Sequence, residues 1–299
     1  MYDVIIIGGG PAGLTAGIYC LRANLKTLIL EKESFGGQIA SSPLVENYPG
    51  FLQISGAELG NKLYEQVENL GADIEVEEAL EIIPGKIKKV ITDYNTYETK
   101  SIIIATGSKY RLLGLDNEEK YLGNGISFCT SCDGAFYKNK ITAVIGGGNT
   151  AVTNAIYLSD ICEKVYLIYR GEKLKCEEKL IEKLKNKNNI ELILNSNVIK
   201  LNGVDVLEEI TIRSGKEEKV IKIDGMFESI GMDPSTEIVK SLLKLNENNY
   251  IISSDCKTNE EGIFVAGDCR EKNLRQLTTA TSDGAIAATN VISYIKLIS

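Results

Sequence analysis

The sequence predicts an α/β fold with two Rossmann-like dinucleotide-binding domains, and three observations support this class. The chain has 299 residues, which suits two domains of roughly 100–200 residues each. Near the N-terminus a buried strand, a glycine-rich turn, a helix and a second buried strand follow one another. The same series begins again at residue 141. Two such units in one chain amount to an internal repeat.

The first repeat begins with a strand over residues 3–7, whose sequence DVIII is almost wholly apolar. The turn GGGPAG follows it, then a helix over 12–23 and a second strand over 26–31. Fully apolar strands are typical of parallel sheets that are covered on both faces. Residues 72–105 form a mixed stretch rich in strands.

The second repeat has the strand ITAVIG from residue 141, the turn GGNTA, a helix to about 160 and the strand KVYLIYR. Beyond this repeat the pattern predicts a helix over 175–186 and several strands between 190 and 230. A last helix is expected over 279–296. The chain is therefore accounted for as two units of the same type.

Composition argues against several classes of function. The chain has 33 basic and 41 acidic residues, a net charge of −8 that does not suit nucleic-acid binding. No apolar run approaches the roughly 18–20 residues of a membrane helix. Histidine is absent, so no imidazole serves as a base or metal ligand, and we expect no metal site. Seven cysteines without a secretory signal indicate the reducing cytoplasm.

The first glycine loop has the spacing G-x-G-x-x-G, formed by Gly8, Gly10 and Gly13. Glycine permits the tight turn, the approach of a pyrophosphate to the backbone, and close helix–strand packing. Glu31 lies 23 residues after Gly8, where a carboxylate can accept hydrogen bonds from ribose hydroxyls. The strand, the helix and the acid together favour a dinucleotide site over a structural turn.

The second glycine loop has the variant spacing G-x-G-x-x-A. Its three positions are Gly146, Gly148 and Ala151. A strand precedes it and a helix follows it, which again predicts a dinucleotide site.

The residues after the second repeat's last strand differ from those of the first. The position that matches Glu31 is Tyr169, which is not acidic. Three cations follow, namely Arg170, Lys173 and Lys175. Loss of the acid and gain of cations favour a 2′-phosphate, and so NADPH over NADH. A solvated basic turn, with Glu172 among the cations, is the alternative.

Only one pair of cysteines is close in sequence, Cys129 and Cys132, before Asp133 and a short apolar run. This context places them at a loop-to-helix junction, where a helix N-terminus stabilises a thiolate. The spacing C-x-x-C lets one sulfur resolve a mixed disulfide formed by the other. Asp133 can transfer a proton if burial raises its pKa, or it can cap the helix. Two buried structural cysteines remain the alternative, since a zinc site lacks further ligands.

The order of these motifs resembles the low-molecular-weight bacterial thioredoxin reductases. GGGPAG, ATG at 105–107, C-x-x-C-D-G, GGGNTA and GDC at 267–269 occur in this order between residue 2 and about 292. The C-x-x-C just before the second glycine loop is the discriminating feature. The resemblance implies FAD as cofactor, thioredoxin as partner and a cytoplasmic homodimer.

The resemblance also implies that the second domain is inserted into the first. An FAD-binding domain then comprises residues 1–111 and 242–299, and a pyridine-nucleotide-like domain comprises residues 112–241. By the same resemblance, electrons are expected to pass from a donor to FAD, to the Cys129–Cys132 disulfide and to oxidised thioredoxin. Cys132 matches the sulfur that faces the flavin, Cys129 the one that attacks thioredoxin, and Asp133 the family's acid.

Most motif positions are assigned to cofactors by the same resemblance. The FAD-binding residues are Gly8, Gly10, Pro11, Ala12, Gly13, Glu31, Gly36, Gly37, Gln38, Asn47, Thr106, Gly107, Gly267, Asp268, Arg275, Gln276 and Leu277. The NADPH-binding residues are Gly146, Gly148, Asn149, Thr150, Ala151, Arg170 and Lys175. Each has a structural alternative: Asn47 can shape a turn, Arg275 can be a surface cation, and Asp268 can cap a helix.

One stretch departs from the family's pattern. The NADPH signature His-Arg-Arg-x-x-x-Arg is matched by Tyr-Arg-Gly-Glu-Lys-Leu-Lys at 169–175, which keeps one arginine of three. Lysine offers a point charge and lacks the bidentate fork of arginine. Thr153 and Asn154 stand where glutamates are usual. A related group, the ferredoxin-dependent flavin thioredoxin reductases, lacks NADPH motifs altogether.

Three hypotheses therefore stand. The leading one is a thioredoxin reductase that uses NADPH weakly, because GGGNTA at 146–151 is whole. The second is the same reductase driven by reduced ferredoxin. The third is a non-catalytic FAD-binding redox sensor, against which the intact dithiol motif argues.

Overall fold

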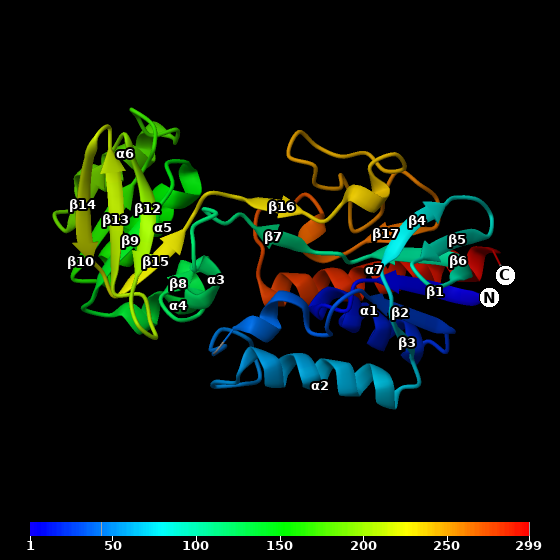
Figure 1. Ribbon diagram of the computed structural model, residues 1–299. Coiled ribbons are helices and arrows are strands. Elements are labelled where there is room, and N and C mark those ends of the chain that lie inside the picture. The colour runs from blue at the N-terminus through cyan, green and yellow to red at the C-terminus, as the bar shows by residue number, and fades with distance from the viewer. Residues whose placement is uncertain (43, 299) are drawn as a thin grey trace. The chain divides into compact units, whose positions relative to one another are not determined.

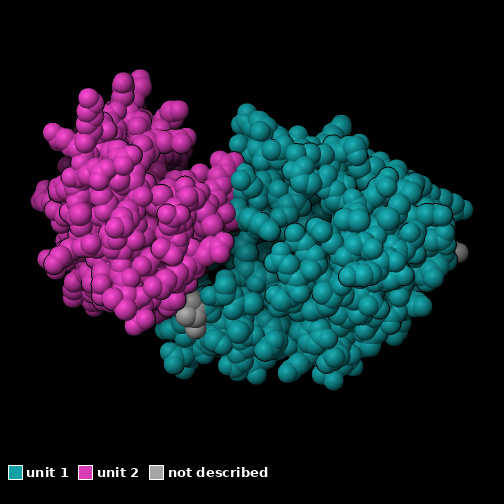
Figure 2. All heavy atoms as spheres, in the orientation of Figure 1, with its two compact units in different colours: residues 1–109, 233–299 teal, residues 110–232 magenta. Residues whose placement is uncertain are grey.

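The computed structural model describes residues 1–42 and 44–298, which form two compact units (Figures 1 and 2). Unit 1 comprises residues 1–109 and 233–299, and unit 2 comprises residues 110–232. β7 (Ser108–Tyr110) and β16 (Met232–Pro234) carry the chain between the units and pair with each other. Among the described residues, no helix has the length and apolar character needed to cross a membrane.

The chain returns to unit 1 nine residues earlier than the sequence predicts, at 232/233 instead of 241/242. Packing explains this difference, because Val239 and Leu243 are buried in a core cluster of unit 1 together with Ile5. The first crossing, at 109/110, lies two residues before the predicted position. Residues 233–241 thus fold with unit 1.

Unit 1 is built on a seven-stranded sheet. Its parallel strands are β3 (Asp73–Val76), β2 (Thr27–Glu31), β1 (Tyr2–Ile7), β6 (Thr96–Ile104) and β17 (Ile263–Val265), and β5 (Lys88–Thr92) and β4 (Ala79–Ile83) extend it antiparallel. Val4 and Ile6 face one buried cluster, and Ile5 and Ile7 face another. This alternation buries both faces of β1, as its apolar sequence predicts.

Three helices accompany this sheet, α1 (Pro11–Arg22), α2 (Gly56–Asn69) and α7 (Leu277–Ile298). α1 and α7 lie against each other (Figure 1) and share the cluster that contains Leu14 and Val291. Gly284 permits their close approach, since a Cβ at this position would lie 2.2 Å from the carbonyl oxygen of Ala12. α7 is longer at both ends than the predicted helix over 279–296.

Unit 2 repeats this plan with a five-stranded parallel sheet. Its order is β11 (Ile190–Ile193), β10 (Lys164–Ile168), β9 (Ile141–Ile145), β15 (Gly225–Glu228) and β8 (Ile126–Ser127). A separate antiparallel sheet contains β12 (Ser196–Asn202), β13 (Glu209–Ser214) and β14 (Glu217–Lys222). The helices are α3 (Glu118–Tyr121), α4 (Thr130–Asp133), α5 (Asn149–Ser159) and α6 (Glu178–Lys185). The predicted α/β class is confirmed.

The helix expected over 175–186 begins only at Glu178. Lys175 instead forms a β-bridge with Gly148, and its N–H donates to the carbonyl oxygen of Gly147 at 2.7 Å. The segment that the periodicity assigned to the helix start is therefore held in extended form beside the second glycine loop.

Candidate functional site

The first glycine loop, between β1 and α1, requires glycine at two of its three positions for steric reasons. Gly8 has φ of +115°, and a Cβ there would lie 2.3 Å from the carbonyl oxygen of Ala105. A Cβ at Gly13 would lie 1.9 Å from the carbonyl oxygen of Gly8. Gly10 differs, since a Cβ there would have no neighbour nearer than the Gly37 Cα at 3.9 Å. Gly10 is the N-cap residue of α1 and has no side chain to cap the helix, so this helix N-terminus can accept a phosphate.

Glu31 is held at this loop from the end of β2. Its Oε2 accepts a hydrogen bond from the Gly9 N–H at 2.7 Å, and its Oε1 accepts one from the Glu33 N–H at 3.1 Å. The carboxylate therefore has a fixed orientation beside the helix N-terminus. This position suits an acceptor for ribose hydroxyls.

The predicted segment Gly36–Gln38 lies against the same loop. The Gly36 N–H donates to the carbonyl oxygen of Gly9 at 2.9 Å, and a Cβ at Gly37 would lie 3.0 Å from the Gly10 Cα. Gln38 donates its side-chain amide to the carbonyl oxygen of Ser108. Because both glycines have positive φ, of +102° and +58°, the turn suits glycine.

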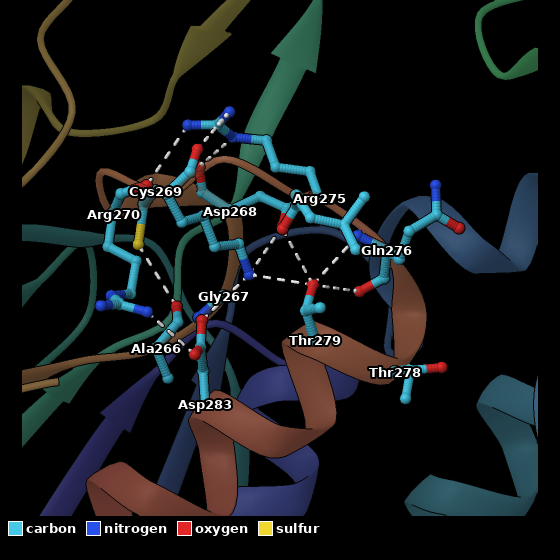
Figure 3. Close-up of polar contacts among 12 residues, drawn as sticks. Ala266, Gly267, Asp268, Cys269, Arg270, Arg275, Gln276, Thr278, Thr279 and Asp283 are labelled. Atoms are coloured by element: carbon cyan, nitrogen blue, oxygen red, sulfur yellow. Dashed lines mark hydrogen bonds and ion pairs between the residues drawn. The ribbon is translucent and has the colours of Figure 1, made fainter. Parts of the chain in front are cut away.

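The C-terminal motif brings a cluster of charged groups to the start of α7 (Figure 3). This α7 charge cluster consists of Asp268, Arg270, Lys272 and Asp283. Asp283 is paired with Arg270 Nη1 at 3.0 Å and with Lys272 Nζ at 2.9 Å, and it accepts a hydrogen bond from the Gly267 N–H at 3.1 Å. Lys272 Nζ also lies 3.4 Å from Asp268. The two acids and two bases balance each other.

Asp268 has a raised pKa because it is buried, although Lys272 acts in the opposite direction. Its Oδ1 has the Lys272 ion pair at 3.4 Å but accepts no hydrogen bond from a described residue, so it can accept one from a bound polyol. Gly267 lies against α1, since a Cβ at this position would be 2.8 Å from the Ala12 Cβ. The motif at 267–269 thus meets the first glycine loop.

Arg275 is not the surface cation of the structural alternative. Its guanidinium donates to the carbonyl oxygens of Asp268, Arg270 and Lys272 at 3.4, 3.3 and 3.2 Å. It also lies 3.9 Å from the ring centroid of Tyr250. Arg275 therefore shapes the loop that carries Asp268.

The other predicted FAD residues belong to the same unit. Asn47 Nδ2 donates to Gln276 Oε1 at 3.3 Å, which joins two segments distant in sequence. Thr106 Oγ1 donates to the carbonyl oxygen of Ser235 at 2.6 Å, and Gly107 has φ of +69°. Leu277 begins α7. The open cradle at Gly10 and the acceptors Glu31 and Asp268 fit a dinucleotide.

The second glycine loop, between β9 and α5, has the same plan in unit 2. Gly146 has φ of +143°, and a Cβ there would lie 2.4 Å from the carbonyl oxygen of Ser229. At Gly148 the nearest atom to a Cβ would be the Lys175 carbonyl oxygen at 4.0 Å. Gly148 is the N-cap residue of α5 and has no side chain to cap the helix. Asn149 is held by Glu177, whose N–H donates to Asn149 Oδ1 at 2.9 Å. The helix N-terminus is open to an anion.

The Tyr169 ring packs on the second glycine loop, at the position where Glu31 contacts the first loop. A Cβ at Gly147 would lie 2.4 Å from the Tyr169 ring, and one at Gly171 would lie 2.6 Å from it. The cations Arg170, Lys173 and Lys175 are exposed, and none forms an ion pair with a described residue. They are free to bind a phosphate.

Cys129 and Cys132 form a disulfide, with an S–S distance of 2.03 Å and Cα atoms 5.2 Å apart. α4 begins at Thr130, so the pair lies at the predicted loop-to-helix junction. The other five cysteines are free, and four of them are buried. Burial raises the pKa of the Cys20 and Cys256 thiols to about 12, which makes them poor nucleophiles at neutral pH.

Asp133 faces Ser127, whose hydroxyl donates to Asp133 Oδ2 at 2.5 Å. Asp133 Oδ1 is buried and accepts no hydrogen bond from a described residue. Burial raises the pKa of Asp133, as proton transfer requires, and Ser127 acts in the opposite direction. The helix-cap alternative is wrong, because the Asp133 side chain forms no cap hydrogen bond.

Ser127 and three members of the α7 charge cluster, Arg270, Lys272 and Asp283, escaped the sequence analysis. Ser127, which also accepts a hydrogen bond from the Cys129 N–H at 3.1 Å, carries no motif of its own. The α7 charge cluster has one signal, since Asp283 is the only acid in the otherwise mostly apolar α7. Among the described residues, no group of three or more His, Cys, Asp or Glu could hold a metal ion.

The whole chain is similar to known proteins of one kind. A family model for pyridine nucleotide-disulphide oxidoreductase matches residues 2–284. A thioredoxin reductase of Bacillus subtilis is 41% identical over 305 residues, with 99% of this chain and 95% of that protein covered. A Clostridium pasteurianum protein described as a 34.2 kDa protein in a rubredoxin operon is also 41% identical, with 98% and 97% covered. The crystal structure of thioredoxin reductase from Streptococcus pyogenes has a TM-score of 0.95 and 39% identity, with 99% of each chain covered.

Proposed function

Because the chain belongs to the pyridine nucleotide-disulphide oxidoreductases, as a low-molecular-weight thioredoxin reductase, we propose that Cys129 and Cys132 are its redox-active pair. The membership that the order of motifs indicated is confirmed. FAD-dependent reduction of thioredoxin follows from it, and a non-catalytic sensor does not fit it. The observation that carries the proposal is the disulfide at the start of α4 with Asp133 beside it.

We assign FAD to unit 1, at the first glycine loop and the start of α7. The cradle at Gly10 fits the pyrophosphate, Glu31 fits the ribose, and Asp268 offers a buried acceptor. Bound FAD supplies a carrier of two electrons between the donor and the disulfide. Asn47 and the segment that Arg275 shapes complete the proposed site.

The reduced Cys129–Cys132 pair reduces thioredoxin by thiol–disulfide exchange. Two electrons and two protons convert the disulfide to two thiols. The Cys129 thiol loses its proton, and the thiolate attacks the thioredoxin disulfide, forms a mixed disulfide and releases one thioredoxin thiolate, which takes up a proton. The Cys132 thiolate then attacks Cys129 Sγ, which restores the disulfide and releases the second thiolate. Burial raises the pKa of Asp133, which suits it to give a proton to a leaving thiolate.

We propose NADPH as the donor, bound weakly at the second glycine loop. The support is the open N-terminus of α5 at Gly148 and the three unpaired cations after β10. Only Arg170 among these cations can form a bidentate pair with a phosphate. We therefore expect weak NADPH binding with little preference over NADH.

We also propose that the protein is a cytoplasmic homodimer, which rests on the family resemblance. Light scattering during gel filtration should give twice the chain mass of 32.7 kDa. A monomer at micromolar concentration would contradict this part of the proposal.

Thioredoxin turnover tests the redox pair. Cys129→Ser and Cys132→Ser should each reduce turnover more than a hundredfold, because each removes one partner of the exchange. Cys176→Ser, a change at a half-buried free cysteine, is the control and should keep full turnover. Full turnover by Cys132→Ser would overturn the assignment.

Anaerobic bleaching of the bound flavin tests the donor, with NADPH, NADH and reduced ferredoxin titrated separately. Bleaching by NADPH at submillimolar concentration is the expected result. Bleaching by ferredoxin alone would replace the proposed donor and leave the thioredoxin half-reaction in place.

A further inference from the structure

The turn that carries the disulfide is tied to the second glycine loop by a short chain of hydrogen bonds. Thr130 lies between the two cysteines and is 5% exposed. Its Oγ1 donates to Asn154 Oδ1 at 2.8 Å, and Asn154 Nδ2 donates to Ser229 Oγ at 2.8 Å. Asn154 belongs to α5, and Ser229 follows β15 directly. All three residues belong to unit 2.

An amide is the group that this chain of bonds needs in its middle. Its oxygen accepts from Thr130 while its nitrogen donates to Ser229, so both ends of the side chain are used. The two bonds fix the amide orientation, which holds the Thr130 hydroxyl in one place. An apolar side chain at this position can form neither bond.

Ser229 gives the chain of bonds a rigid end. Its N–H donates to the carbonyl oxygen of Ile145 at 2.8 Å, which continues the β9–β15 pairing. Its own carbonyl oxygen lies so close to the glycine loop that a Cβ at Gly146 would be only 2.4 Å from it. The dithiol turn is thus anchored to the strand end from which the glycine loop departs.

We infer that Asn154 is a positioning residue for the redox dithiol. It holds α4, a helix of a single turn, so that the two sulfurs stay close together in the reduced state as well as in the disulfide. Two thiols held close have a high effective concentration towards each other, which favours the disulfide. This inference rests on the proposed role of Cys129 and Cys132.

Without these bonds, the reduced turn gains conformational freedom. The oxidised turn gains less, because the disulfide still constrains it. Reduction of the disulfide by two electrons and two protons therefore becomes easier, and the reduction potential of the pair rises. A neutral hydrogen bond contributes enough to change such an equilibrium by about threefold to tenfold. Asn154 anchors Thr130, so its loss should have the effect at the upper end of this range.

The thiol–disulfide equilibrium with glutathione measures this effect in the FAD-bound protein. Alkylation and mass spectrometry give the fraction of Cys129–Cys132 disulfide at each ratio of reduced to oxidised glutathione. We expect Asn154→Ala to shift the equilibrium about tenfold towards the dithiol, or ~30 mV for a two-electron couple. Ser229→Ala removes the distant bond alone and should shift it about threefold.

Thr130→Val is the decisive variant, since valine has the shape of threonine and only the hydroxyl is lost. It should reproduce the shift of Asn154→Ala, and the double variant should shift the equilibrium no further, because both changes remove the same bond. Thr153→Ala, at an exposed neighbour on α5, is the control and should leave the equilibrium unchanged. Melting temperature is followed for every variant, so that a general loss of stability is recognised.

Shifts below twofold in both Thr130→Val and Asn154→Ala would overturn the inference, as would additive shifts in the double variant. If Asn154→Ala does not fold, Thr130→Val alone decides. Failure of the proposed function has a different signature, namely full thioredoxin turnover by Cys132→Ser. The two outcomes are therefore distinguishable.

Discussion

The two glycine loops use one backbone design with different side chains around it. Each follows a parallel strand, opens a helix whose N-cap residue is a glycine, and leaves space beside that glycine, Gly10 or Gly148. In unit 1 the Glu31 carboxylate accepts a hydrogen bond from the loop, and in unit 2 the Tyr169 ring covers it. In the proposed function, the loop takes the phosphate in both units, and the residue at the end of the second strand or directly after it determines which sugar group is recognised.

The units also differ in how they bury charge. In unit 1 the α7 charge cluster pairs two acids with two bases. In unit 2 two buried acids, Glu118 and Glu228, lie beside each other, without a basic partner among the residues that the structure describes. Glu118 accepts hydrogen bonds from the three N–H groups at 113–115. Burial first, and hydrogen bonding with Glu118 second, raise the pKa of Glu228 to about 9. Glu228 is therefore protonated at neutral pH.

Substitutions at the third motif position should affect the two glycine loops very differently. Gly13→Ala places a Cβ 1.9 Å from the Gly8 carbonyl oxygen, so we expect loss of at least nine-tenths of the bound FAD or loss of folded protein. Ala151→Gly, at the matching position in unit 2, should cost only about 1 kcal/mol and keep FAD in full. Flavin absorbance per chain after gel filtration and urea unfolding measure both effects. Full FAD binding by Gly13→Ala would contradict the steric argument.

Restoring the family's phosphate signature after β10 should strengthen NADPH binding at the second glycine loop. We expect the triple variant Tyr169→His, Gly171→Arg, Lys175→Arg to lower the KM for NADPH at least tenfold, because it adds two guanidinium forks. Initial rates with thioredoxin at varied NADPH and NADH concentrations measure it.

Gly171→Arg alone is the matched control for this variant. A Cβ at Gly171 would lie 2.6 Å from the Tyr169 ring, so the single change should bring no gain while the tyrosine is present. If the triple variant remains inert to NADPH while ferredoxin drives the wild type, the nucleotide site is a relic.

The buried acids of unit 2 predict a smaller effect, on stability against pH. The folded state holds the Glu228 proton up to about pH 9, whereas the unfolded chain releases it near the ordinary glutamate pKa of 4.5. The stability that this proton contributes is full below the lower value and is lost as pH rises through the higher one. Glu228→Gln, which is uncharged in both states, should therefore stabilise unit 2 at pH 8, and the gain should shrink as pH falls towards 5.

Urea unfolding at pH 5, 7 and 8.5 measures the effect of Glu228→Gln. The exposed neighbour of Glu118 supplies the control, since Glu119→Gln should leave the pH dependence unchanged. Equal pH profiles for Glu228→Gln and the wild type would show that Glu228 is ionised in the folded protein.

Local patterns predicted the repeated strands, turns and helices well, because each is encoded within a few neighbouring residues. The return to unit 1 at 232/233 was predicted nine residues late, since only the packing of Val239 shows where residues 233–241 belong. The start of α6 was predicted early, because the bridge between Lys175 and Gly148 overrides the helical periodicity.

The candidate site also contains residues that the sequence predicts and contacts that only the fold shows. Gly8, Gly10, Gly13 and the two cysteines stand in motifs whose spacing is visible in the sequence. The bonds from Asn154 to Thr130 and Ser229 join positions 24 and 75 residues apart, which no spacing rule connects. Asn154 therefore looked in the sequence like the loss of a glutamate, and its two hydrogen bonds became visible only in the fold.

The contact between α1 and α7 has a consequence for synthesis on the ribosome. Unit 2 is a continuous segment, so it can fold as soon as it has left the exit tunnel. Unit 1 lacks β17 and α7 at that moment, and the apolar face of α1 that α7 covers, with Leu14 and Ala16, is without its partner. At roughly 5–20 residues per second this interval lasts several seconds. The nascent chain is thus most open to chaperones, and to aggregation, while its dithiol unit is already complete.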